Sequence, residues 1–288
     1  MVEIGGSQFL GAPLELGQSG ASLSLIQSST GGSVIIKRDS ANALRLIKQY
    51  EKQILVAESF SPFISVPKIL SDFSDSSFAM EFIHGQTLGE FLETSTRDEL
   101  TSVSDQINGY LSSNKEPSSE VIDIDPIVEK ILAIKSSLSD SVFNPIFIEL
   151  ADILRNRISE VNTVTGLNHG DFSFENLLVE KFTHKVFAID FLDSPVETRL
   201  IDYGRFWLDV NFGWWANWGK ESTRYSLNRD YIGSSLTKAL EAQNIPRFDV
   251  EFFCGIAILR ITPYTKNPKR IAFLQHAARQ LVKELNWN

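Results

Sequence analysis

The sequence of 288 residues has little cysteine, no long apolar run and no excess of positive charge. Cys254 is its only cysteine, which excludes an intrachain disulfide and a cysteine-based zinc site. No apolar run approaches the roughly 20 residues that cross a bilayer, and the first residues lack a leader pattern. The net charge of −9 argues against nucleic acid or an anionic membrane as the main partner. We therefore expect a protein of the reducing cytoplasm.

The chain has the composition of a globular protein, with 43% hydrophobic and 22% charged residues, and its pattern changes near residue 84. Before that point Leu23–Ile26 and Val34–Lys37 flank a Gly-Gly turn and predict a β-hairpin, and residues 40–59 follow a helical period. After it, helical patterns dominate, interrupted by residues 166–192. The sequence predicts an α+β, two-lobe fold. Residues 1–84 would form a small β-rich lobe and residues 85–288 a larger, mainly helical lobe.

The interrupting segment carries three polar residues at spacings that suit phosphoryl transfer. Asp171 and Asn176 stand five positions apart, and Asp190 ends an apolar strand nineteen positions after Asp171. One carboxylate can orient an accepting hydroxyl. The amide and the second carboxylate can hold Mg²⁺ against nucleotide phosphates, because Mg²⁺ prefers oxygen ligands and needs only one or two protein carboxylates.

His169-Gly170-Asp171, the Asn176 that follows, and Ile189-Asp190-Phe191 together resemble the signature of the aminoglycoside phosphotransferase and choline kinase-like superfamily. These proteins are small-molecule relatives of protein kinases. The resemblance implies a protein-kinase-like fold with a nucleotide-binding N-terminal lobe and a catalytic, substrate-binding C-terminal lobe. It implies Asp171 as the catalytic residue, Asn176 and Asp190 as magnesium ligands, and His169 as structural support.

The implied reaction transfers the γ-phosphate of ATP, or of GTP, to a hydroxyl of a sugar, an aminoglycoside or an amino-alcohol-like substrate. The partners are then a nucleotide and a small molecule, with no nucleic acid and no membrane, and the oligomeric state stays open. The run Phe172-Ser173-Phe174-Glu175 is loosely similar to members found with surface-polysaccharide biosynthesis.

Two charged residues before residue 84 are expected to form an ion pair at the nucleotide site. Lys37 ends an apolar strand, like the kinase lysine that holds the α- and β-phosphates. Glu51 falls on an apolar helical stripe, where a carboxylate is costly unless it is paired, so we predict a Lys37–Glu51 pair. Glu58 lies on the same stripe and is the alternative. The stripe consists of Leu44, Ile47, Ile54 and Leu55.

Two backbone regions are further nucleotide candidates. The stretch 17–22 lacks the Gly-x-Gly-x-x-Gly pattern, but Gly20 would let the backbone approach phosphate and Ser22 could add a hydroxyl. Residues 80–83 resemble the kinase hinge, where the Glu81 carbonyl and the Ile83 amide would hold adenine.

Residues after Asp190 complete the predicted site. The family's Asp-Pro dipeptide is replaced by Asp-Ser-Pro, which leaves the local geometry open, while Asp202 fits the structural aspartate that braces the catalytic loop. An aromatic cluster includes the substrate candidates Trp207, Trp214, Trp215 and Trp218. Their faces suit sugar rings or quaternary ammonium groups, and the alternative is that they pack in the core.

Two other functions stay open at this point. One is a catalytically silent kinase-like binding protein, which the presence of Lys37, Asp171, Asn176 and Asp190 disfavours. The other is a protein kinase, which is less favoured because no Ala-Pro-Glu motif follows Asp190.

Overall fold

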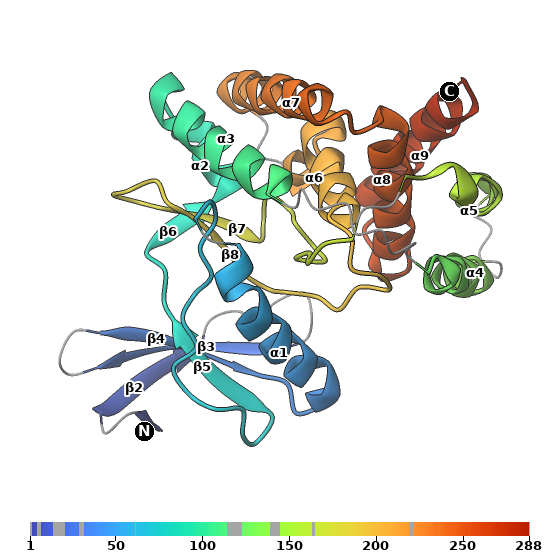
Figure 1. The fold of residues 1–288 in the computed structure, drawn as a ribbon. Helices are drawn as coiled ribbons and strands as arrows, with labels where there is room; N and C mark the ends of the chain where they lie inside the picture. Colours follow the sequence, from blue (N-terminus) through green and yellow to red (C-terminus); the bar gives the residue numbers. More distant parts are fainter. Residues whose placement is uncertain are drawn as a thin grey trace.

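The structure, a computed structural model, describes residues 2–4, 7–13, 21–28, 32–60, 62–113, 123–138, 145–162, 165–218 and 222–287. Figure 1 shows a small sheet with one helix beside it at one end, and a larger body of helices at the other. This is the predicted α+β architecture. None of the helices among these residues combines the length and the apolar character that crossing a membrane requires.

The larger sheet is antiparallel throughout, with its strands in chain order. Its strands are β1 (Val2–Ile4), β2 (Ser7–Pro13), β3 (Ser22–Ser28), β4 (Ser33–Arg38) and β5 (Ser77–Glu81). Strands β3 and β4 confirm the predicted hairpin, with Leu25 opposite Ile35. Lys37 pairs with Phe78 in the register of β4 and β5. The β4 lysine and the end of β5, which leads into the predicted hinge, thus belong to neighbouring strands.

Helix α1 (Ala43–Ser59) forms where a helix was predicted, but it turns a different face inward. Leu46 and Val56 are buried, whereas Leu44 is 71% exposed and Leu55 is 60% exposed. The inward face also carries Gln49, Lys52 and Gln53, and the Gln53 side chain donates to the Pro67 carbonyl at 2.9 Å. Polar side chains are tolerated inside when they are hydrogen-bonded. Reading only apolar residues therefore chose the wrong stripe.

The helical body packs around α6, whose residues are buried along almost its whole length. Its helices are α2 (Leu88–Thr94), α3 (Arg97–Ser112), α4 (Asp125–Leu138), α5 (Pro145–Arg157), α6 (Leu200–Phe212), α7 (Thr223–Gln243), α8 (Arg247–Ile261) and α9 (Pro268–Trp287), with 3₁₀ turns at Ile158–Glu160, Trp215–Trp218 and Thr262–Tyr264. Gly204 lets α6 approach α8, since a Cβ there would lie 2.3 Å from the Phe253 carbonyl carbon. Thr87 and Glu90 form a capping box at the start of α2.

A second, three-stranded sheet places the predicted motifs together. Its strands are β6 (Gly85–Thr87), β7 (Leu177–Glu180) and β8 (Val186–Ala188), in that order and antiparallel. Because β7 and β8 are antiparallel neighbours, the residue before β7 and the residue after β8 meet at one end of the sheet. The Ile189 amide accordingly donates to the Asn176 carbonyl at 2.9 Å.

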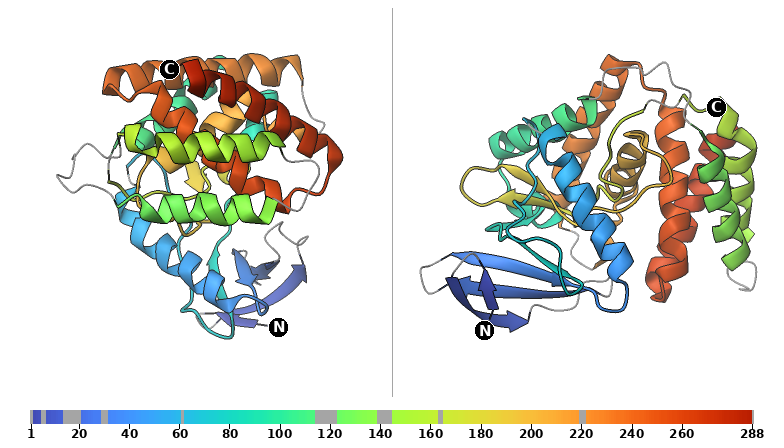
Figure 2. Two further views of the ribbon diagram at one scale, coloured as in Figure 1. Left: turned by 90° about the vertical axis from the view of Figure 1, so that its right-hand side faces the viewer. Right: turned by 60° about the horizontal axis from the view of Figure 1, so that its bottom comes forward.

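Residues of the sheet form two small core clusters, while the large core cluster of the helical body also includes residues from α1. Val56 and Phe60, at the C-terminal end of α1, belong to the same core cluster as the helices of the body. The Phe60 ring lies 4.5 Å from that of Tyr110 on α3 and 5.8 Å from that of Phe191. Both views in Figure 2 show α1 lying between the sheet and the helical body. The division of the chain into two lobes near residue 84 stays a prediction from the sequence.

Candidate active site

Asp202 holds the loop of His169, Gly170 and Asp171 through hydrogen bonds to its backbone amides. Asp202 is fully buried, and its carboxylate accepts the His169 amide at 2.7 Å, the Gly170 amide at 2.9 Å and the Tyr110 hydroxyl at 2.5 Å. Gly170 has a φ of 86°, and a Cβ there would lie 2.3 Å from the Leu192 carbonyl oxygen. The tight turn therefore requires glycine at this position. Asp202 thus occupies the place in which a brace for the loop was expected.

His169 joins the loop to the segment that contains Asp190. Its Nε2 lies 2.7 Å from the Ile189 carbonyl oxygen, and its Nδ1 accepts the Asp171 amide at 3.2 Å. Since a carbonyl only accepts, the ring proton belongs on Nε2. Burial lowers the pKa of His169 below its ordinary value, which fits this neutral, singly protonated ring. The position of His169 suits structural support rather than proton transfer.

The Asp171 carboxylate is fixed by two neighbours. Asn176 donates through Nδ2 to the Asp171 carbonyl and to its Oδ2, both at 2.9 Å, and Arg205 donates through Nε to Oδ1 at 2.7 Å. Burial alone would raise the pKa of Asp171, but the positive charges of Arg205 and Arg260 outweigh it and hold that pKa below its usual value. The group is therefore an ionised hydrogen-bond acceptor at neutral pH.

Arg205 is a site residue that the sequence analysis missed. Its guanidinium is buried and bridges Asp171 to Asp209, whose Oδ2 lies 3.0 Å from Nη1. Asp209 in turn accepts the backbone amide of Phe174 at 3.1 Å. A signal for it exists in the sequence, because Asp202, Arg205 and Asp209 recur at spacings of three and four along a mainly apolar helix.

Asp190 occupies a backbone conformation that is rare for a residue with a side chain. Its φ is 61°, in the left-handed region, which costs about 1–3 kcal/mol and persists only where the surroundings enforce it. Hydrogen bonds hold the residues around it, from the Ile189 amide to the Asn176 carbonyl and from the Leu192 amide to the His169 carbonyl. These contacts with Asn176 and His169 thus hold Asp190 in this conformation.

Lys37 pairs with Asp190 rather than with a glutamate of α1. Its Nζ lies 2.7 Å from Asp190 Oδ1, and the lysine is 3% exposed. Glu51 and Glu58 are both exposed, on the outer face of α1, and neither forms an ion pair with Lys37 among the described residues. The predicted Lys37–Glu51 pair and its Glu58 alternative are therefore wrong, because α1 turns Gln49, Lys52 and Gln53 inward instead.

Asp190 and Asn176 fit a magnesium ion bound together with phosphates. The Asp190 side chain is 38% exposed, and Asn176 uses its amide nitrogen on Asp171, which leaves its Oδ1 as the atom for a cation. A carboxylate and an amide oxygen are hard ligands of the kind that Mg²⁺ takes beside phosphate oxygens.

The other predicted nucleotide residues lie along β3 and at the end of β5. The Ser22 hydroxyl donates to the Arg38 carbonyl across the hairpin at 3.3 Å, and Gly20 lies outside the described residues. The Glu81 amide donates to the Lys68 carbonyl at 2.9 Å, while the Ile83 amide has no protein acceptor in the described part of the chain. A cavity of about 530 Å³ is lined by Phe82 of the predicted hinge and by residues of α2 and β7, but not by Glu81 or Ile83.

The tryptophans predicted to contact substrate are core residues. Trp207, Trp214 and Trp215 are each 5% exposed and belong to the main core cluster. The Trp215 ring stacks on Tyr225 at a centroid distance of 5.1 Å. Rings packed in this way have no free face for a sugar or an ammonium group, so the structure corrects this expectation in favour of core packing. The Trp218 side chain lies outside what the structure describes.

The whole chain is similar to solved structures of small-molecule kinases. A protein assigned as a fructosamine-3-kinase from Thermobifida fusca matches over 97% of this chain and 96% of its own, with a TM-score of 0.64 at 14% identity. The choline kinase LicA from Streptococcus pneumoniae matches over 96% and 94%, with a TM-score of 0.61 at 12% identity. Macrolide 2′-phosphotransferase type I matches over 96% and 91%, with a TM-score of 0.59 at 14% identity.

A structure of LicA in complex with AMP gives a TM-score of 0.60 at 12% identity and matches over 96% of this chain and 93% of that chain. No protein-family model and no curated protein matches the sequence. At these identities the likeness establishes the fold. The chain therefore has the protein-kinase-like fold of the aminoglycoside phosphotransferases and choline kinases, as its sequence motifs predict.

Proposed function

We propose that the protein is a kinase that transfers the γ-phosphate of ATP, or of GTP, to a hydroxyl group of a small molecule. One observation carries the proposal. One loop carries both the Asp171 carboxylate and the Asn176 amide. Asp190 follows the Ile189 amide that is hydrogen-bonded to this loop, and its Oδ1 lies 2.7 Å from Lys37 Nζ. An acceptor-orienting carboxylate, two hard metal ligands and a phosphate-binding lysine are the parts that phosphoryl transfer needs.

Asp171 would accept a hydrogen bond from the substrate hydroxyl and take its proton at the end of the transfer. The transition state is loose, so positioning contributes more than early deprotonation, and a carboxylate with a low pKa can serve. Arg205 holds Oδ1 and Asn176 holds Oδ2, so the carboxylate is oriented before substrate arrives. This preorganisation is the protein's contribution to the rate.

Magnesium would be held by Asp190 and Asn176, and when bound it neutralises the developing charge on the phosphates. Lys37 would hold the α- and β-phosphates, and the ion pair with Asp190 keeps its ammonium beside the metal ligands. The hinge groups, the Glu81 carbonyl and the Ile83 amide, would hold the adenine ring. The Ser22 hydroxyl, and Gly20 in the stretch outside the described residues, would lie over the phosphates.

The fold likeness supports a small-molecule acceptor. Relatives by fold are named for fructosamine, choline and macrolide phosphorylation, and one holds AMP. For this chain we propose a sugar, aminoglycoside or amino-alcohol-like acceptor, with surface-polysaccharide metabolism as the context that the loop resemblance favours.

The test is a measurement of Mg²⁺-dependent ATP and GTP consumption against a panel of hydroxylated small molecules. A thermal-shift titration with each nucleotide runs beside it, since a bound nucleotide raises the melting temperature by mass action. We expect nucleotide binding and acceptor-dependent turnover that Asp171→Ala abolishes. Binding without turnover for any acceptor would favour the silent binding protein instead, and absence of both would contradict the kinase proposal.

A further inference from the structure

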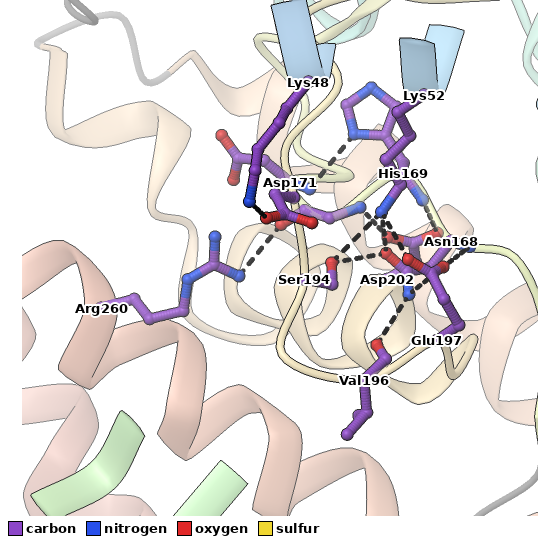
Figure 3. A network of polar contacts seen from close by, with 12 residues as sticks. Lys48, Lys52, Asn168, His169, Asp171, Ser194, Val196, Glu197, Asp202 and Arg260 are labelled. Carbon is purple, nitrogen blue, oxygen red and sulfur yellow. Dashed lines mark hydrogen bonds and ion pairs between the residues drawn. The ribbon is translucent and has the colours of Figure 1, made fainter. Parts of the chain in front are cut away.

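Helix α1 gives Lys37 no carboxylate, but it sends two lysines of its own toward the catalytic loop and the segment after Asp190. Lys48 and Lys52 lie one turn apart on the helix. Figure 3 shows both side chains descending from α1 toward the loop of Asn168, His169 and Asp171. The Lys52 side chain ends in a buried position, whereas the Lys48 side chain ends at the surface, so we expect different roles for the two lysines.

Lys52 is buried and fully engaged. It is 8% exposed, and its ammonium donates to Asn168 Oδ1 at 3.0 Å, Glu197 Oε1 at 3.1 Å and Ser194 Oγ at 3.4 Å. An ammonium has three hydrogens to donate, and here it has three acceptors. A buried charge is costly without such partners, and these three acceptors stabilise the Lys52 ammonium in its buried position.

The three acceptors are also bonded to one another. Glu197 Oε2 accepts the Asn168 backbone amide at 3.2 Å and its side-chain amide at 3.0 Å. The Ser194 hydroxyl donates to Asn168 Oδ1 at 2.7 Å. Lys52 is therefore the point at which α1, the catalytic loop and the segment after Asp190 meet, as the dashed contacts of Figure 3 show.

This network adjoins the reacting groups on both sides. Asn168 directly precedes His169 and stands three positions before Asp171, and Ser194 stands four positions after Asp190. A displacement of the Asn168 side chain would be carried along the loop to the Asp171 carboxylate. A misplacement of ~1 Å at a reacting group can cost ~10²-fold in rate.

We propose that Lys52 is a positioning residue for the transfer reaction, coupling α1 to both Asp171 and Asp190 through Asn168, Ser194 and Glu197. The proposal rests on the proposed kinase function. Through Lys52, α1 contacts the candidate site directly, although it supplies no carboxylate to Lys37.

Lys48 provides a matched control on the same helix. Its ammonium lies 2.7 Å from Asp193 Oδ2, but the two side chains are 52% and 61% exposed. Exposed ion pairs contribute little, and this one reaches no residue of the catalytic loop. Removal of Lys48 thus changes a lysine of α1 without touching the network.

The experiment compares Lys52→Met, Lys52→Arg and Lys48→Met in the full chain, with kcat and the KM for nucleotide measured on each. We expect Lys52→Met to lower kcat by about tenfold or more, with the KM for nucleotide within about twofold of wild type, since the lost contact positions the loop. Lys52→Arg should restore part of kcat because the cation returns, and Lys48→Met should stay within about twofold. A kcat of Lys52→Met equal to that of Lys48→Met would overturn the proposal.

Hydrogen exchange gives a readout that does not depend on activity. The amides of His169, Gly170 and Leu192 should exchange faster in Lys52→Met, while the amides of α8 stay protected. Faster exchange spread evenly over the chain would mean a merely structural role and would overturn the proposal. A wild-type protein without transferase activity would contradict the kinase proposal. The exchange pattern would still decide whether Lys52 couples α1 to the loop.

Should Lys52→Met fail to fold, Glu197→Gln removes the opposite charge while keeping an acceptor oxygen for Asn168. The same selective change in kcat and in loop exchange is expected for it. Wild-type kcat and wild-type exchange in Glu197→Gln would contradict the coupling.

Discussion

The loop that carries Asp171 is held from two sides, and the charged residues on the two sides differ in how far they are buried. From α6, Asp202, Arg205 and Asp209 hold it, and all three are almost completely buried within the helical body. From the other side, Lys37 and Lys52 are buried lysines whose partners Asp190 and Glu197 are 38% and 44% exposed. The difference teaches that the α6 side belongs to the core of the body, whereas each of the two buried lysines pairs with a carboxylate that is partly exposed to solvent.

The largest effect should follow from removing the brace on the α6 side. Asp202→Ala leaves two loop amides and the Tyr110 hydroxyl without their acceptor in a buried site. Each buried donor that is left without an acceptor costs about 1–3 kcal/mol, so the loss of Asp202 should cost several kcal/mol. We expect the free energy of unfolding, measured with urea, to fall by that order, and activity to fall with it. Wild-type stability with lost activity would show that Asp202 acts at the reacting groups, and it would contradict the view that the α6 side stabilises the core.

The next effect concerns Asp190 on the solvent-facing side. Asp190→Asn should lower Mg²⁺-dependent turnover by at least ~10²-fold, because even partners outside a metal's direct ligands are worth ~10–100-fold. Asparagine tolerates the left-handed backbone of this position, so the fold should be kept. The measurement is a Mg²⁺ titration of the rate, with Asn176→Ala expected to be milder and to raise the Mg²⁺ requirement. Unchanged Mg²⁺ dependence in both variants would refute the metal assignment.

A smaller effect is expected where a buried carboxylate lacks the partners that the α6 side supplies. Asp249 is buried on α8, its Oδ1 accepts the Asn162 amide at 3.3 Å, and its Oδ2 has no partner among the described residues. Burial raises the pKa of Asp249 to about 6.

Since the folded pKa lies above the unfolded value, folding is favoured by protonation, and this stability is lost as pH rises from about 4 to about 6. Asp249→Asn should therefore be more stable than wild type at pH 8, by about 1–3 kcal/mol, and equal to it below pH 4. Urea unfolding at the two pH values measures the difference. An Asp249→Asn advantage that is the same at both would contradict this account.

The sequence predicts that the candidate site residues lie close together, because they are near one another along the chain. Asp171 and Asn176 lie on one short loop, and the antiparallel pair β7 and β8 that follows brings Asp190 back beside it. The same holds for the hairpin that carries Lys37, where alternation and a turn define the register.

What the sequence does not reveal depends on contacts between distant segments. Helix α1 leaves Leu44 and Leu55 exposed and buries Gln53 and Lys52, which find hydrogen-bond partners far along the chain. The spacing of Arg205 on α6 marks it as unusual, but its contact with Asp171 forms only once the loop is folded against α6. The aromatic residues near Trp215 fit either a binding surface or a core, and only packing decides between them.

The central claim is that Asp171 orients the acceptor, and one variant tests it most directly. Asp171→Ala should keep its fold and a nucleotide affinity close to wild type, while kcat falls by about 10²–10⁴-fold, the range that a positioned proton acceptor supplies. Isothermal titration with ATP and Mg²⁺ and single-turnover kinetics on the same preparation give both numbers. A folded Asp171→Ala protein with near-normal kcat, or one that loses nucleotide binding and stability together with its rate, would contradict the account.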